Sequence, residues 1–211
     1  FSEVWLRRPE PGDSSATIYA ALDSPSVTGA YRFVITPGED TTVEVTMRLF
    51  LRKDIKQLGI APLTSMFLHN GADKGSFDDF RPSVHDSEVL VLNAGKDATL
   101  CRPLNNPPRL ASSYFGAQSP RSFGLAQRNR DFEHYLDAQA HYERRPSLMI
   151  EPLGDWGKGT VRLVEIPSDL EGNDNIVAYW IPEGETRAGD ELAYDYRMHW
   201  GMNPPGATPQ T

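Results

Sequence analysis

The sequence predicts an all-β fold, a sandwich with long polar loops and little helix. Short extended segments follow one another along the chain, and several of them alternate between apolar and polar residues. That period of two is typical of a strand with one face in water. The chain also contains 17 prolines and 17 glycines. Frequent turns and a scarcity of helical periodicity favour a sandwich or barrel over alternating strands and helices.

The clearest strand is expected at 41–50, where Val43, Val45 and Met47 fall on one face. Together with 30–35 it predicts a hairpin that turns at the sequence PGEDT. Further strands are expected at 1–6, 15–22, 89–92, 147–152, 160–166, 176–181 and 191–200.

Helix is expected at one place only, a turn or two over Arg52–Leu58 that Gly59 ends. The last residues, 201–211, have no apolar pattern and are typical of a linker. We therefore expect one β domain over 1–200. The chain starts directly in an extended segment, which leads us to expect that further chain precedes it.

Composition excludes several classes of function. The net charge of −8 argues against a nucleic-acid partner, because phosphate binding needs a basic face. The sequence has no apolar run of membrane-spanning length, and Cys101 has no second cysteine for an intrachain disulfide. Zinc-ligand spacing, a serine nucleophile elbow and a phosphate-binding glycine loop are also missing from the sequence. We expect no metal and no cofactor.

The stretch 77–87, FDDFRPSVHDS, is the first candidate site. It is rich in charge and poor in aliphatic residues, so it reads as an irregular loop, where sites concentrate. An alternative interpretation of Asp78 and Asp79 is that they only solvate a turn. Arg81, His85 and Asp86 are required by no turn type, and they are therefore candidate site residues.

A second acidic loop precedes the expected strand 176–181. Asp174 stands there between Asn173 and Asn175, at the mouth of an apolar run. The two asparagines are candidate substrate-binding residues, because their amides suit a water or a sugar hydroxyl. Two carboxylates on two loops are the minimal equipment for acid–base chemistry on a glycosidic bond.

The region 102–155 combines arginines with aromatic residues. Aromatic faces and planar hydrogen-bonding groups are what a sugar-binding groove needs. The same ingredients also fit a salt-bridged loop that lies over the sandwich. Trp156, in the glycine turn 154–159, is either a stacking platform or a plug over a sheet end. The candidate substrate-binding residues of this region are Arg128, Arg130, Asp131, Tyr135 and Trp156.

Long motifs of the chain resemble the osmoregulated periplasmic glucan biosynthesis proteins of the G and D type. They include DSPSVTGAYRF, FDDFRPSVHDS, RPLNNP, FGLAQRNRDFEHY, YERRPSLMIEPLGDWGKG and NDNIVAYW. The similarity runs from about residue 1 to 200. It implies the later part of a large galactose-mutarotase-like β-sandwich, followed by a linker toward an immunoglobulin-like domain.

The resemblance implies action on β-1,2-glucan in the periplasm, with inversion at the anomeric carbon. The aspartate of the HDS motif matches the family's general base, here Asp86, and that of NDN matches its general acid, here Asp174. It leaves three alternatives open: an endo-β-1,2-glucanase, an inverting transglycosylase, or a non-catalytic glucan-binding protein that assists the membrane glucosyltransferase. Half a sandwich leaves strand edges unpaired. We therefore expect this chain alone to be inactive and to need either the missing N-terminal half or another copy, as a homo-oligomer.

Overall fold

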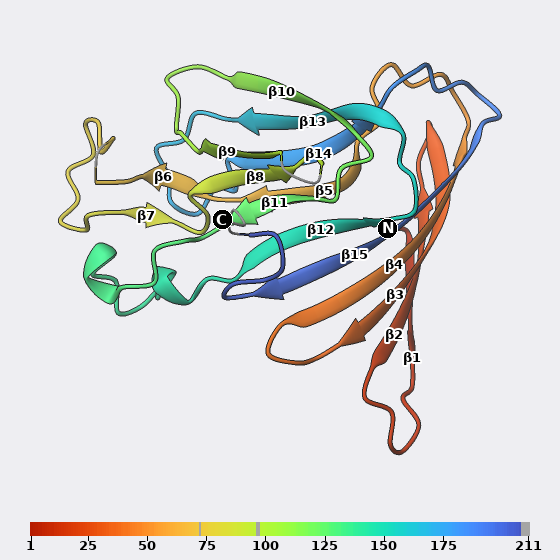
Figure 1. Ribbon diagram of the computed structural model, residues 1–211, viewed down its shortest axis with the longest axis horizontal. Helices are drawn as coiled ribbons and strands as arrows, with labels where there is room; N and C mark the ends of the chain where they lie inside the picture. The colour runs from red at the N-terminus through yellow and green to blue at the C-terminus, as the bar shows by residue number, and fades with distance from the viewer. Residues whose placement is uncertain (72, 96–97, 208–211) are drawn as a thin grey trace.

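The computed structural model describes residues 1–71, 73–95 and 98–207, and it confirms the all-β prediction (Figure 1). A nine-stranded sheet has the order β1-β2-β3-β4-β15-β12-β11-β8-β9, a four-stranded sheet has the order β10-β13-β14-β5, and β6 pairs with β7. The strands of the nine-stranded sheet are Glu3–Arg7 (β1), Ala16–Asp23 (β2), Val27–Thr36 (β3), Thr41–Leu51 (β4), Glu191–Gly201 (β15), Ser147–Leu153 (β12), Ser122–Ala126 (β11), Val89–Asn93 (β8) and Thr99–Pro103 (β9). The others are Ala111–Gln118 (β10), Lys158–Glu165 (β13), Ile176–Pro182 (β14), Ile60–Ser65 (β5), Phe67–His69 (β6) and Val84–His85 (β7).

The described helices are two 3-10 turns, Phe132–His134 (η1) and Tyr142–Arg144 (η2). Neither is long and apolar enough to cross a membrane.

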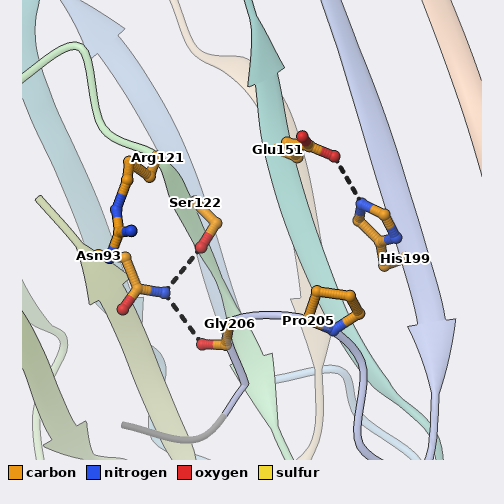
Figure 2. Close-up of a pocket in the computed structure, with 7 residues that line it drawn as sticks. All are labelled: Asn93, Arg121, Ser122, Glu151, His199, Pro205 and Gly206. Carbon is orange, nitrogen blue, oxygen red and sulfur yellow. Dashed lines mark hydrogen bonds and ion pairs between the residues drawn. The ribbon is translucent and has the colours of Figure 1, made fainter. Parts of the chain in front are cut away.

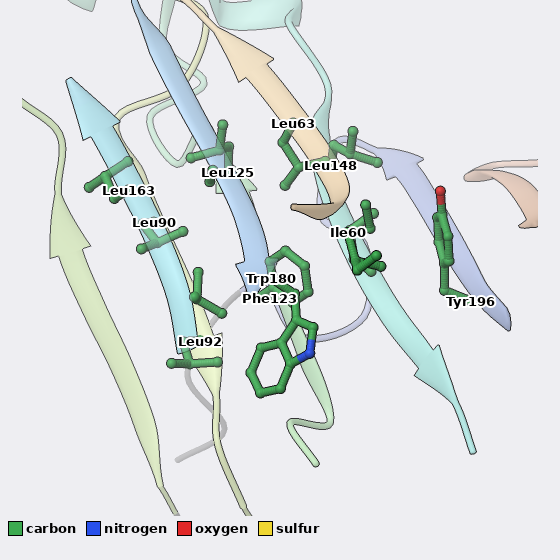
Figure 3. Close-up of a cluster of buried hydrophobic side chains, with 14 of the residues drawn as sticks. Ile60, Leu63, Leu90, Leu92, Phe123, Leu125, Leu148, Leu163, Trp180 and Tyr196 are labelled. Atoms are coloured by element: carbon green, nitrogen blue, oxygen red, sulfur yellow. The ribbon is translucent and has the colours of Figure 1, made fainter. Parts of the chain in front are cut away.

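The core lies between the two sheets (Figure 3). Leu90, Leu92 and Phe123 enter it from the nine-stranded sheet, and Leu163 and Trp180 enter it from the four-stranded sheet. All five side chains are fully buried. Their burial supplies the main favourable free energy that holds the two layers together.

Strands β1 to β3 extend beyond the strands that the four-stranded sheet faces (Figure 1). The predicted hairpin is confirmed, because β3 pairs antiparallel with β4 and Thr36 lies opposite Thr42 across the turn. The predicted alternation of β4 is confirmed as well, with Val45 and Met47 buried. Every residue of β1 is exposed, so this end of the sheet has an open, apolar edge.

The predicted helical turn over 52–58 is wrong. The segment is a series of bends in which Ile55 forms an isolated bridge with Thr186, whose carbonyl oxygen accepts the Ile55 N–H at 2.9 Å. Partners far along the chain replace helical hydrogen bonds, since so short a segment is not a stable helix by itself. Gly59 ends no helix. A Cβ there would lie 2.8 Å from the Tyr179 ring, so packing explains the glycine.

The polar region 102–155 contains two strands that the sequence did not predict, β10 and β11. Every residue of β11 is buried, because the strand lies between β8 and β12. Gly124 of β11 has no room for a side chain, since a Cβ would lie 2.1 Å from the Leu148 carbonyl oxygen.

The segment after β15 returns onto the outer face of the nine-stranded sheet instead of leaving as a free linker. Ala207 is buried against Val89, Val91 and Met149, and Asn93 Nδ2 donates to the Gly206 carbonyl oxygen at 3.0 Å (Figure 2). The rest of the expected linker, 208–211, lies outside the described residues.

Candidate functional site

A pocket of about 250 Å³ opens where several strand ends meet, and both predicted catalytic carboxylates line it. Strands β5, β11, β12 and β15 form its walls, while the loop after β7 brings Asp86 and the loop before β14 brings Asp174. The lining residues are Leu63, Thr64, Ser65, Asp86, Ser87, Leu125, Arg145, Pro146, Leu148, Asp174 and Trp200. The two loops predicted from the sequence therefore meet at one site.

Asp86 is held by the last residue of β5 and by Met66, which lies between β5 and β6. Its backbone N–H donates to the Met66 carbonyl oxygen at 2.9 Å, and Ser65 Oγ donates to Ser87 Oγ at 2.9 Å. These bonds fix the backbone on both sides of the carboxyl group, whose side chain is only 30% exposed.

Asp174 is exposed at the pocket rim, and its two asparagine neighbours hold the loop. Asn175 is buried: its Oδ1 accepts the Phe67 N–H at 2.8 Å, and its Nδ2 donates to the Phe67 carbonyl oxygen at 2.9 Å. Asn173 Nδ2 donates to Ser168 Oγ at 3.2 Å. The expectation that Asn175 contacts substrate is wrong, because its amide is used to anchor the loop to β6.

The two carboxylates sit in different environments. Burial raises the pKa of Asp86, Arg145 opposes that rise, and the carboxylates of Asp174 and Glu171 add to it. The Arg145 Nε lies 3.2 Å from Asp86 Oδ1. The pocket therefore holds one half-buried carboxyl and one exposed carboxyl, and a difference in environment is what lets two carboxyls take separate acid and base roles.

Arg81 lies beside this pocket rather than in it. Its guanidinium donates to Asp79, Asp137 and Glu171, and the pKa of Arg81 is raised by these bonds. Each N–H of the guanidinium has a carboxylate acceptor, so these bonds hold Arg81 to neighbouring loops, and its contact with substrate stays a prediction.

His85 is fully buried. Its ring stacks on Phe67 with the centroids 5.2 Å apart, and its Nδ1 lies 2.8 Å from Gln127 Oε1. Burial lowers the pKa of His85 to about 4, so the ring is neutral at neutral pH. The predicted substrate contact of His85 is wrong, because the ring supports β7 from within.

Tyr135 and Trp156 were expected to line a sugar-binding groove, and this expectation is also wrong. Tyr135 is fully buried, and its hydroxyl donates to the Asn129 carbonyl oxygen at 3.1 Å. Trp156 packs in the main core, with its ring centroid 6.3 Å from that of Trp180. Of the two interpretations of Trp156, the plug over a sheet end is the one the structure bears out.

Three further candidates of the polar region lie away from this pocket, and the two arginines among them are tied to other protein groups. The Arg128 Nε donates to Glu88 Oε1 at 2.9 Å. Arg130 Nη2 donates to the Met202 carbonyl oxygen at 2.7 Å, which fastens the returning segment. Asp131 is exposed at the start of η1. None of the three lines the Asp86–Asp174 pocket, so the salt-bridged-loop interpretation describes them better than the groove.

Sequence reasoning missed two residues that do line the pocket. Arg145 was noted only as one of several arginines, yet it pairs with Asp86. Trp200 is the last residue but one of β15 and is 39% exposed, so it offers an aromatic face to the pocket. A signal for Trp200 was available in the sequence, because it is the last residue of the expected strand 191–200 and strand ends carry site residues.

A second pocket of about 320 Å³ lies at the returning segment (Figure 2). Its acidic residue is Glu151, which pairs with His199 at 2.8 Å and Arg197 at 3.1 Å. Glu151 is the one acidic side chain among the described residues that line this pocket. The pocket therefore has no pair of facing carboxylates like Asp86 and Asp174. Among residues 1–71, 73–95 and 98–207, no group of three or more histidine, cysteine or acidic side chains is arranged to hold a metal ion.

Comparisons with known proteins match the whole chain to one family. The family described as "Periplasmic glucan biosynthesis protein, MdoG" matches residues 1–211. A glucans biosynthesis protein G of Cereibacter sphaeroides is 60% identical over 204 residues, which cover 97% of this chain and 38% of that protein. A probable glucans biosynthesis protein D of Shewanella oneidensis is 49% identical over 210 residues, covering 100% of this chain and 39% of that protein.

The chain therefore spans 38% and 39% of the length of these two relatives. Among solved structures, the X-ray structure of a galactose mutarotase related enzyme from Lactobacillus acidophilus aligns with a TM-score of 0.38 at 9% identity. That alignment covers 98% of this chain and 74% of the other.

Proposed function

Because this chain belongs to the MdoG family of periplasmic glucan biosynthesis proteins, we propose that its pocket binds a β-1,2-linked glucan in the periplasm and cleaves or rearranges the backbone with anomeric inversion. The observation that carries this proposal is the meeting of Asp86 and Asp174 in one pocket, from loops far apart in the sequence. A protein that only binds glucan has no need of two carboxylates directed at one bond.

The chemistry assigns one proton transfer to each carboxylate. Asp174 protonates the departing glycosidic oxygen as the bond to the anomeric carbon breaks. Asp86 accepts the proton of the attacking water or sugar hydroxyl as the new bond forms on the opposite face of the ring. Attack from the face opposite the leaving group inverts the configuration at the anomeric carbon.

Other lining residues supply binding. The exposed face of Trp200 suits the C–H face of a glucose ring, as aromatic side chains do in sugar sites. Arg145 steadies the ionised form of Asp86, because it lowers the pKa that burial raises.

A second candidate function is a non-catalytic glucan-binding protein that assists the membrane glucosyltransferase, as a monomer or as a homo-oligomer. The Asp86–Arg145 ion pair favours it, since a carboxylate held by a guanidinium is a weaker base. Under this alternative the pocket holds the glucan and leaves its backbone intact.

Incubating the full protein with linear β-1,2-glucan distinguishes the two functions. An enzyme shortens the chains or redistributes their lengths, and an Asp13→Asn variant, changed at an exposed turn, does the same. A binding protein retains the glucan on a column but leaves the length distribution unchanged. Unchanged lengths with enzyme in excess over prolonged incubation would remove the catalytic proposal.

A further inference from the structure

We propose that Arg81 is a positioning residue that locks together the three loops of the site, an inference that rests on the proposed function. Arg81 lies in the loop before β7, and Asp86 follows that two-residue strand. Asp137 lies between η1 and η2, and Arg145 follows η2. Glu171 shares the loop before β14 with Asp174. One guanidinium therefore connects three segments, each of which leads within a few residues to a charged residue of the pocket.

The contacts of Arg81 use all of its donors. Nη2 donates to Asp79 Oδ2 and to Glu171 Oε2, each at 2.7 Å. Nη1 donates to Asp137 Oδ2 at 2.6 Å and to Glu171 Oε1 at 3.0 Å, while Nε donates to Asp79 at 3.1 Å. A guanidinium forms such forked contacts with carboxylates, and a lysine ammonium does not.

The cluster is sheltered, which makes these contacts effective. The side chain of Arg81 is 15% exposed, and that of Asp137 is 11% exposed. Ion pairs that are sheltered from solvent are weakened less by water and dissolved salt than exposed pairs are. Tyr142 adds a further link, because its hydroxyl donates to Glu171 and the Arg145 guanidinium lies over its ring. The two sides of the pocket are thereby joined through Glu171.

Arg81 also balances charge near the reacting groups. The charged groups that face Asp86 are Arg145, Asp174 and Glu171, and the last two raise the pKa of Asp86. Those that face Arg81 are Asp79, Asp137 and Glu171, with His69 and Lys74 beyond Asp79. Without Arg81, the Glu171 carboxylate is no longer neutralised, and its effect on Asp86 grows.

The test compares Arg81→Gln and Arg81→Lys with Arg48→Gln in the full protein. Arg48 pairs with Asp195 on an exposed part of β4, remote from the pocket, and serves as the matched control. We expect Arg81→Gln to lower kcat about 10²-fold with KM changed only a few-fold, because small displacements of reacting groups cost about that much. Arg81→Lys should recover little of the loss, and Arg48→Gln should behave as wild type.

The pH profile supplies a readout that a merely structural role would not move. Asp86 must be ionised to act as base, so a higher pKa moves the acid limb of kcat/KM to higher pH. Arg81→Gln should show this shift. An increase in KM alone, or kinetics unchanged from wild type, would overturn the inference.

Two further variants keep the outcomes separate. If Arg81→Gln does not fold, Asp137→Asn removes one arm of the lock while leaving the guanidinium paired, and it should give a smaller loss of kcat; an unchanged kcat would overturn the inference. If Asp174→Asn keeps its activity, the proposed function fails. If Asp174→Asn is inactive while Arg81→Gln is normal, only the positioning role fails.

Discussion

Replacing Asp174 by asparagine is expected to lower the rate of glucan cleavage by about 10²–10⁴-fold, the usual contribution of a general acid. Glucan binding should change little, because Asp174 is exposed at the rim and the buried Asn175, not Asp174, holds the loop. The measurement is the turnover of β-1,2-glucan together with its dissociation constant. Activity within a few-fold of wild type would remove Asp174 from the mechanism.

A substrate with a good leaving group tests which carboxylate is the acid. An aryl leaving group departs without protonation, so a variant that lacks the acid loses less activity on an aryl glycoside than on glucan. We expect this pattern for Asp174→Asn and not for Asp86→Asn. The opposite pattern would make Asp86 the acid and Asp174 the base. Burial raises the pKa of Asp86, which is the direction that an acid role requires.

The second large effect is expected in the core. Trp180 is fully buried between the sheets, and its ring fills the space beside Gly159, where a Cβ would lie 2.3 Å from a ring atom. Trp180→Ala should lower the free energy of unfolding by about 3–5 kcal/mol, as large-to-small core substitutions of this kind do.

Denaturant unfolding measures this loss, with Phe80→Ala as the control because Phe80 is 80% exposed. Trp180→Phe should lower the free energy of unfolding less than Trp180→Ala does, because phenylalanine still fills most of the space. It also loses no hydrogen bond, since the indole N–H of Trp180 has no acceptor among the described residues. A loss below about 1 kcal/mol for Trp180→Ala would show that the two layers do not depend on this side chain.

Local pattern was sufficient for the more regular strands and for the two acidic loops, but it did not predict β5, β9, β10 or β11. The alternation of 41–50 predicted β4 because one face of that strand packs on the core and the other faces solvent. Asp86 and Asp174 were found because each follows or precedes a strand in a charged or amide-rich loop. Because the ends of packed strands lie close together, the loops that carry Asp86 and Asp174 meet at one pocket.

The roles of the neighbouring residues could not be predicted in this way. Burial of Tyr135 and Trp156 depends on contacts far along the chain, such as that between Trp156 and Tyr194, 5.3 Å apart by ring centroids. The pairing of Arg81 with Glu171 joins two distant loops. An arginine beside aromatic residues looks the same in sequence whether its donors face a sugar or another loop.

The anomeric form of the first product tests the central claim most directly. Inverting enzymes hold acid and base roughly 6.5–9.5 Å apart so that a water or hydroxyl fits between them, whereas retaining enzymes hold them about 5–5.5 Å apart. If Asp86 activates the attacking oxygen and Asp174 protonates the leaving one, proton NMR of the full protein with β-1,2-glucan should show the α anomer at the new reducing end first. Initial formation of the β anomer would contradict this mechanism.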